Sequence, residues 1–256
     1  MVQSSVLKEE KRDEMKCRFL AVAVLMVFTF AFLNLVGCFP DNPIRITDHF
    51  FSDDFAQDAG NWIYVGSAVR DEENGYVVLT QAVDHQVGVI WLTMPIDFPF
   101  MVELRYKAGG GTGADGFVVM FYKDRNYIPD GGGDLGFDDG TNPAPGYGIE
   151  FDNWKNPECD PDHRHIAFVK DFCCDHLSWV HDERVEDFQW HYVEIWVTNL
   201  AYSAKSLVEV FVDGDRVLKW KGILDKAFGW FGIGAATGYH NNWHIIDDIK
   251  IYRVLQ

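Results

Sequence analysis

Short segments in which apolar and polar residues alternate recur along the chain from Ile44 onward. In Val102–Lys107 and Val208–Asp213, apolar residues return at every second position, which is the period of a strand with one buried face. Asp213-Gly214 then leads into Arg216–Trp220, and an Asp-Gly pair between two such segments is typical of a hairpin. This part of the chain shows neither a long amphipathic helical pattern nor an internal repeat. We therefore predict one all-β domain.

Further strands are expected where similar segments are separated by glycine, proline and aspartate. Many short strands with such turns indicate an antiparallel sandwich or barrel. Aromatic residues make up 15 % of the sequence, and their side chains suit pleated faces as well as the C–H faces of sugar rings. The expected strands are Tyr76–Gln81, Val87–Leu92, Phe117–Tyr122, Tyr147–Asp152, His165–Lys170, Val193–Val197, Phe231–Ala236 and Ile245–Tyr252.

An uncharged apolar run, Phe19–Val36, lies near the N-terminus. As a helix, its length of about 18 residues would extend roughly 27 Å, close to the thickness of a bilayer's hydrocarbon core. Five basic residues precede it, which predicts a cytoplasmic N-terminus and export of the rest. They are Lys8, Lys11, Arg12, Lys16 and Arg18.

The apolar run ends in Leu35-Val36-Gly37-Cys38, which resembles a bacterial lipobox with Cys38 as the lipidated residue. An uncleaved signal anchor is the alternative, and both place the domain outside the cytoplasm, attached to the membrane. We expect four parts: a basic region at 1–18, a signal peptide or anchor at 19–38, a linker at 39–46 and the sandwich at 47–256.

The expected compartment decides whether the cysteines can form a disulfide, and the net charge limits which partners the protein can bind. Outside the cytoplasm a disulfide can form, and Cys159 could pair with Cys173 or Cys174. The formal net charge of −17 argues against nucleic acid as a partner, because the domain would repel phosphate. It also supplies carboxylates for a hard cation such as calcium.

The segment Gly148–Ile166 concentrates polar residues of the types that bind metals. Glu150 and Asp152 are two apart on an expected strand, so their side chains share one face. Calcium prefers oxygen ligands, including backbone carbonyls. The calcium ligands expected here are the side chains of Asp152, Asn156 and Asp160 and the carbonyl of Trp154.

A second divalent ion could use a mixed set of carboxylates and imidazole from the same segment. Such a set suits a transition metal such as manganese. Its expected ligands are Glu150, Asp152, Asp160 and His165, with His163 as a rival to His165.

This segment resembles the metal-binding loop of the L-type (legume-like) lectins, in the concanavalin A-like lectin and glucanase superfamily. Their pattern is Glu-x-Asp-x-aromatic-x-Asn, then Asp-Pro, then His-Ile, and all three parts occur within Glu150–Ile166. Three more segments resemble the family in the same chain order: Gly113–Gly116, Gly131–Gly136 and Gly232–Gly238. The resemblance implies a jelly-roll β-sandwich, here in a membrane-anchored prokaryotic member.

The resemblance also implies a shallow carbohydrate site. In it Asp115, after a cis peptide, accepts hydrogen bonds from sugar hydroxyls, while Asn156 and the N–H of Gly133 donate to them. Trp154 stacks on the sugar ring. Tyr239 and His240 lie in the loop that tunes specificity, and the metal orders Asn156.

Two other functions remain open at this point. Glucanases of the same fold carry Glu-x-Asp-x-x-Glu on one strand, but Lys155 stands at the last position, and Glu158 lies past Pro157 in the loop. An adhesion module without a sugar site is the other alternative, since the fold alone does not imply a site. We expect glycan binding without catalysis, and a homo-oligomer by analogy with other lectin sandwiches.

Overall fold

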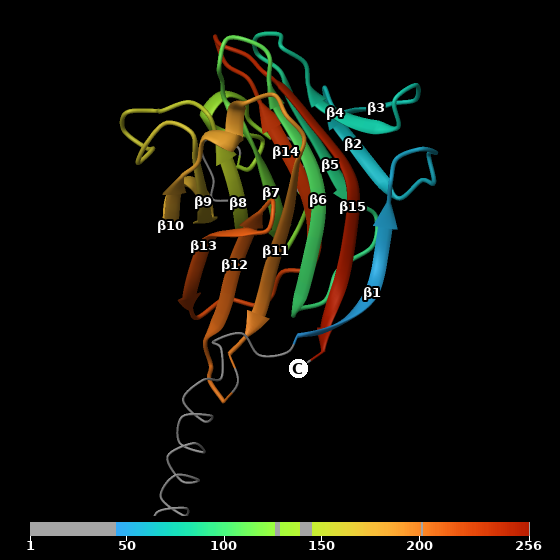
Figure 1. The fold of residues 1–256 in the computed structure, drawn as a ribbon, viewed down its shortest axis with the longest axis vertical. Coiled ribbons are helices and arrows are strands. Elements are labelled where there is room, and N and C mark those ends of the chain that lie inside the picture. The colour runs from blue at the N-terminus through green and yellow to red at the C-terminus, as the bar shows by residue number, and fades with distance from the viewer. Residues whose placement is uncertain (1–44, 126–128, 139–144, 201, 256) are drawn as a thin grey trace, which may run out of the picture. The chain divides into compact units, whose positions relative to one another are not determined.

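Two antiparallel sheets packed face to face form the fold (Figure 1). The computed structural model describes residues 45–125, 129–138, 145–200 and 202–255. Sheet A has the strand order β13-β12-β11-β6-β15-β4-β3, with β1 also pairing with β15. Sheet B has the order β10-β9-β8-β7-β14-β5-β2. The predicted antiparallel β-sandwich is therefore confirmed.

The strands of sheet A are β1 (Ile46–Asp53), β3 (Val69–Asp71), β4 (Tyr76–Thr80), β6 (Phe100–Gly109), β11 (His191–Asn199), β12 (Ser206–Val212), β13 (Asp215–Gly222) and β15 (Trp243–Leu255). Those of sheet B are β2 (Trp62–Gly66), β5 (Val87–Leu92), β7 (Gly116–Tyr122), β8 (Gly146–Asp152), β9 (His165–Lys170), β10 (Phe172–His181) and β14 (Trp230–Ala236). The 3-10 turns are η1 (Gly132–Asp134) and η2 (Glu183–Glu186).

The main core lies between the sheets and is rich in aromatic side chains. On β7 the inward positions are Phe117, Val119 and Phe121, which are all buried. Phe117 stacks on Phe151 of the neighbouring strand, with ring centroids 4.5 Å apart. Strand β8 uses its odd-numbered residues here, so its even-numbered residues point to the other face of sheet B.

A second apolar cluster covers that other face of sheet B. Val118 and Met120 from β7 pack there with Leu135 and Phe137, which come from the segment that contains η1. This segment folds over the sheet, so β7 is buried on both faces. It brings the glycine-rich residues 131–133 to the end of the sheet where β7 begins.

Four strands were not predicted: β1, β2, β3 and β10. Strand β10 mixes exposed and half-buried residues, and its pairing with β9 shifts register at His176. Its residues therefore lack a clear period-two pattern.

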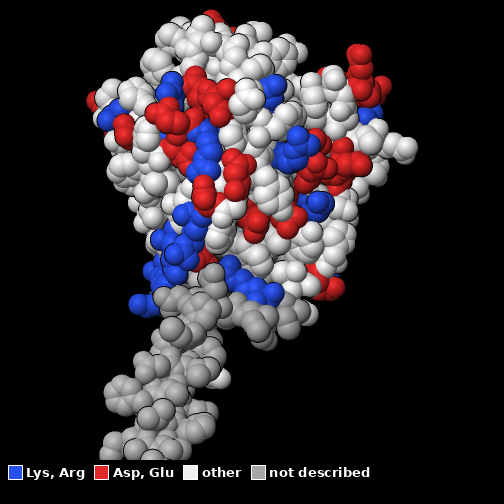
Figure 2. Space-filling view, in the orientation of Figure 1, with Lys and Arg blue, Asp and Glu red and all other residues white. Residues whose placement is uncertain are grey.

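The outer face of sheet A carries acidic and basic side chains next to each other (Figure 2). Glu209, which is fully buried, lies 3.0 Å from Arg216 and 3.5 Å from Lys219. Arg105 pairs with Asp248 at 3.2 Å. Ion pairs therefore account for part of the charge on this face.

The predicted membrane segment at 19–38, including Cys38, lies outside the described residues. Within the described residues, no helix has the length and apolar character needed to cross a membrane.

Candidate functional site

Strand β8 carries two acidic side chains on the outer face of sheet B. Asp152 lies directly opposite His165 on β9, and Glu150 lies opposite the small Ala167. Glu150 is 1 % exposed and Asp152 is 3 % exposed. Buried carboxylates are costly unless they are paired or bind a metal, so these positions indicate a site.

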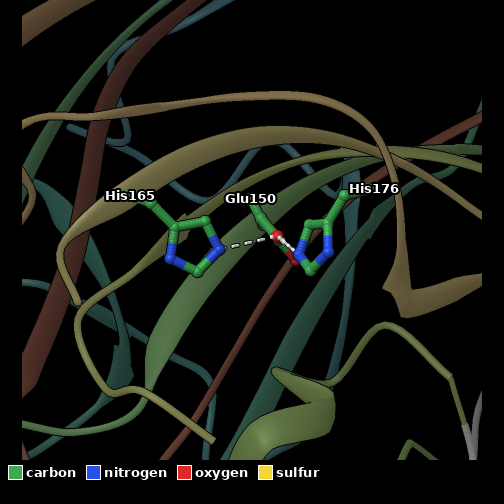
Figure 3. A group of neighbouring side chains, drawn as sticks. All are labelled: Glu150, His165 and His176. Carbon is green, nitrogen blue, oxygen red and sulfur yellow. Dashed lines mark hydrogen bonds and ion pairs between the residues drawn. The ribbon is translucent and has the colours of Figure 1, made fainter. Parts of the chain in front are cut away.

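Glu150 lies between two imidazoles (Figure 3). Its Oε1 is 3.1 Å from Nε2 of His165 and 2.7 Å from Nε2 of His176. Burial acts to raise the pKa of Glu150, but the contacts with His165 and His176 outweigh burial and hold the pKa below its ordinary value. The three residues come from β8, β9 and β10, and their ligand atoms lie within 4.8 Å of one another.

A second group of ligand atoms, from Asp152, Asp160 and His165, also lies within 4.8 Å. The loop after β8 brings Asp160 back to the sheet, where its Oδ2 accepts a 2.5 Å hydrogen bond from the backbone N–H of Asn156. Oδ1 of Asp152 accepts a 2.8 Å hydrogen bond from the N–H of Trp154. The loop thus wraps around its own carboxylates.

The electrostatics of this group favour a bound cation. Burial raises the pKa of Asp152 well above its ordinary value, and the charges of Asp160 and Glu150 raise it further. Burial also raises the pKa of Asp160. A divalent ion would remove this repulsion, and the oxygens of Asp152, Asp160 and Asn156 with the Trp154 carbonyl are hard donors of the kind calcium takes. The residues present therefore fit calcium.

Asp115 immediately precedes β7, beside this loop, and follows a cis peptide from Ala114, as expected. Its carbonyl accepts hydrogen bonds from the N–H groups of Asn153, at 2.8 Å, and Trp154, at 3.3 Å. Burial, followed by the charge of Asp160, raises the pKa of its carboxyl to about 7. Oδ2 of Asp115 is buried without a hydrogen-bond partner in the described structure, so it has an acceptor free for a ligand.

Gly133 lies against the side chain of Asn156. A Cβ atom added at Gly133 would stand 2.0 Å from Nδ2 of Asn156, so any side chain here would require the Asn156 amide to move. The packing of Leu135 and Phe137 on sheet B holds this glycine segment in place. Residues distant in the sequence, 133 and 156, are thus brought together.

A pocket of about 750 Å³ opens where these segments meet. Trp154 stacks on His240 in its wall, with ring centroids 4.6 Å apart, while Tyr239 is 86 % exposed. Five of the predicted carbohydrate-binding residues line it: Asp115, Trp154, Asn156, Tyr239 and His240. The sixth, Gly133, contacts Asn156, whereas its neighbours Gly131 and Gly132 line the pocket.

Three residues near the site were not anticipated. His176 was missed because β10 has no clear strand pattern; an imidazole close after the metal-loop segment was the only available signal. His85 lines the pocket and packs edge-on against Tyr239, with ring centroids 4.8 Å apart. Asn153 is buried with both side-chain polar atoms lacking hydrogen-bond partners in the described structure.

The alternatives raised by the sequence also have places in the structure. His163, the rival to His165, is exposed and belongs to neither ligand group in the described residues. Glu158 is exposed, and Lys155 donates a 3.2 Å hydrogen bond from Nζ to the carbonyl of Pro161. Cys159 pairs with Cys174, which leaves Cys173 as a buried free thiol.

A sandwich with buried acidic and imidazole ligands beside an aromatic-lined pocket is the architecture of a lectin-type domain. The family model described as the legume-like lectin family matches residues 53–256, and the chain belongs to that family. The comparison with curated protein sequences gave no match.

Several solved structures share the fold. The exoplasmic/lumenal domain of VIP36, bound to Ca2+ and Man3GlcNAc, is 17 % identical with a TM-score of 0.64, covering 80 % of this chain and 90 % of that one. The Bauhinia forficata lectin in complex with GalNAc is 17 % identical with a TM-score of 0.66, covering 81 % and 97 %. The basic winged bean lectin with Tn-antigen is 19 % identical with a TM-score of 0.67, covering 83 % and 100 %.

Proposed function

We propose that this protein is a calcium-dependent carbohydrate-binding protein displayed outside the cell membrane. The observation that carries the proposal is the convergence of Asp115, Asn156 and Trp154 on one pocket, directly beside the buried carboxylates Asp152 and Asp160. Family membership supports the same conclusion.

In this proposal calcium orders the loop but does not contact the sugar, which is bound by protein side chains. Asp152, Asp160 and Asn156 would hold it with the Trp154 carbonyl. The ion supplies positive charge that neutralises the carboxylates and fixes the loop. Asn156 and Trp154 would then be held in place before the sugar arrives, which lowers the entropy cost of binding.

Several side chains that line the pocket suit sugar recognition. The free Oδ2 of Asp115 accepts a hydrogen bond from a sugar hydroxyl, and the Asn156 amide donates one. Trp154 presents an aromatic wall that suits the C–H face of a sugar ring. Tyr239 and His240, at the rim, are placed to select among sugars.

The arrangement supports binding in preference to hydrolysis. Retaining glycosidases need two carboxyl groups about 5–5.5 Å apart on either side of the scissile bond. Here Glu150 and Asp152 are buried under the loop, and Lys155 stands where a second strand carboxylate would be needed. We therefore propose no catalytic role for Glu150.

Display at the membrane is proposed from the apolar run 19–36 and from Cys38. Cells that express the full chain would be grown with labelled palmitate. Label on the wild type but not on Cys38→Ala would support lipidation, whereas an unlabelled wild type in the membrane fraction would indicate an uncleaved anchor. Wild-type protein confined to the cytosol would contradict membrane display.

The central test is a broad glycan array probed with the full chain in calcium and again after chelation. We expect binding in calcium that is lost with chelator. Asp152→Ala should abolish calcium and glycan binding together, because the proposed ligand set is shared. The matched control is Glu158→Ala, which removes an exposed carboxylate of the same loop and should leave both intact.

Two results would count against the proposal. Glycan affinity that survives Asp152→Ala unchanged would disprove the role of calcium. A folded wild type that binds no glycan in calcium would leave a sandwich that acts as an adhesion module.

A further inference from the structure

Two imidazoles meet on one oxygen of a fully buried carboxylate. Nε2 of His165 is 3.1 Å from Oε1 of Glu150, and Nε2 of His176 is 2.7 Å from the same atom. The His165 side chain is fully buried, and the His176 side chain is 10 % exposed. Figure 3 shows both rings turned toward Glu150 from opposite sides.

Neutralising the Glu150 charge does not require both rings. His165 already lies within hydrogen-bonding distance of the carboxylate. Nε2 of His176 makes a second ion-pair contact with the same oxygen, at 2.7 Å. Two buried imidazole nitrogens gathered on one carboxylate oxygen, with all three ligand atoms within 4.8 Å of one another, are the arrangement expected of a metal site.

We propose that Glu150, His165 and His176 form a zinc site, with His176 as a second imidazole ligand. The inference does not rest on the proposed calcium ligands; it takes Glu150 and His165 from the residues expected for a second ion beside them. It changes the expected second ion from manganese to zinc.

The spacing of the ligand atoms suits zinc. Imidazole and carboxylate ligands bind zinc at about 2.0–2.2 Å in a near-tetrahedral array, which places neighbouring ligand atoms roughly 3.3 Å apart. The distances of 3.1 Å and 2.7 Å therefore need to open by about 0.2 Å and about 0.6 Å to reach this spacing.

Ligand chemistry separates this ion from calcium. Calcium takes oxygen ligands, which the neighbouring Asp152 and Asp160 supply. A site with two imidazoles favours zinc over manganese, because affinity for nitrogen ligands rises from manganese to zinc across the divalent series. The two clusters would thus divide the ions by donor type.

The test uses the full chain stripped with chelator and then saturated with calcium. Zinc and manganese are titrated separately against a chromophoric competitor. We expect one tightly bound zinc per chain, with manganese weaker. His176→Gln should weaken zinc binding by more than about 100-fold, since losing even an indirect partner of a ligand costs about 10–100-fold. His181→Gln, on the same strand with an exposed imidazole, should match the wild type.

A second measurement needs no variant and so does not depend on how well His176→Gln folds. X-ray absorption at the zinc edge of the wild-type protein counts imidazole ligands. Two imidazoles are expected. One imidazole, manganese bound more tightly than zinc, or unchanged zinc affinity in His176→Gln would each overturn the assignment.

Neither readout uses a glycan, so the zinc site and the proposed lectin function can fail separately. If the protein binds zinc through two imidazoles but binds no glycan on the array, this inference stands and the proposed lectin function fails. Glycan binding by a protein that takes no zinc would do the reverse.

Discussion

Asp115 shows how one residue joins two parts of the candidate site. Its backbone carbonyl accepts hydrogen bonds from the metal loop, and its carboxylate faces the pocket with Oδ2 free. Both functions depend on its place immediately before β7. The side chain can therefore be tested apart from the backbone.

Asp115→Ala should remove glycan binding while leaving calcium binding and folding intact, because only the pocket-facing carboxylate is lost. Glycan affinity and calcium affinity would be measured on the same preparation. Unchanged glycan binding would rule out this residue as a sugar ligand. Loss of calcium as well would mean that the side chain supports the loop.

Gly133→Ala should weaken glycan binding by about 10- to 100-fold, the loss expected when one or two hydrogen bonds are misplaced. A Cβ here would stand 2.0 Å from the Asn156 amide and push it aside. Gly229→Ala is a suitable control, since its nearest neighbour would be 3.7 Å away. Titration with a glycan found on the array measures the difference, and equal affinities would show that Asn156 is not placed by this contact.

The loop after β8 is held by a hydrogen bond within it and by a disulfide to a neighbouring strand. The Asp160 carboxylate accepts a hydrogen bond from the backbone N–H of Asn156, and the disulfide Cys159–Cys174 links the loop to β10. The same β10 carries His176 two residues further on. The disulfide therefore joins the strand of the proposed zinc ligand to the proposed calcium loop.

Replacing both cysteines, Cys159→Ser with Cys174→Ser, should lower the free energy of unfolding by about 3 kcal/mol, as expected for a loop of this size. The sequence separation is 15 residues. Calcium affinity should fall too, because Asp160 adjoins Cys159. Urea unfolding and calcium titration check both, with Cys173→Ala as the control that spares the disulfide. A variant as stable as the wild type would show that the metal loop needs no tether.

A ligand that binds only the native state of the sandwich stabilises the whole domain against unfolding. If calcium binds as proposed, chelation should lower the melting temperature by roughly 5–10 °C when free calcium had been about 100-fold above its Kd. Calorimetry with and without chelator measures this shift. In protein kept free of zinc, the Asp152→Ala variant should show no shift, and an equal shift in that variant would place the stabilising ion elsewhere.

Acid should destabilise the sandwich through His244, which is fully buried on β15 with Nδ1 2.7 Å from Oγ1 of Thr80. Burial lowers its pKa to about 3, whereas in the unfolded chain the pKa is about 6.5. Below pH 6.5 His244 binds a proton in the unfolded chain but not in the folded chain. The free energy of unfolding therefore falls as the pH drops toward 3. The loss should reach about 2 kcal/mol at pH 5.

Urea unfolding at pH 7 and pH 5, in chelator, tests this origin. His244→Gln should lose less stability between the two pH values than the wild type, while the exposed His163→Gln should behave like the wild type. Equal losses in all three proteins would assign the acid effect to other groups.

The period-two pattern predicts strands such as β6 and β11, because a half-buried strand must alternate. Strands buried on both faces, such as β7, are instead predicted as short apolar runs between turns. The grouping of the candidate metal-binding residues between Glu150 and His165 could be anticipated because they lie close in sequence and the strand places Glu150 and Asp152 on one face. Asp115 and Gly133 were anticipated only through the resemblance to lectins.

What required the tertiary structure were contacts between distant segments. The packing of Leu135 and Phe137 on sheet B brings Gly133 to Asn156, and no local pattern encodes that contact. The pairing of β10 with β9 brings His176 to Glu150. Local periodicity is set by the geometry of one strand, whereas the partners of a buried side chain are set by which strands pair and in which register.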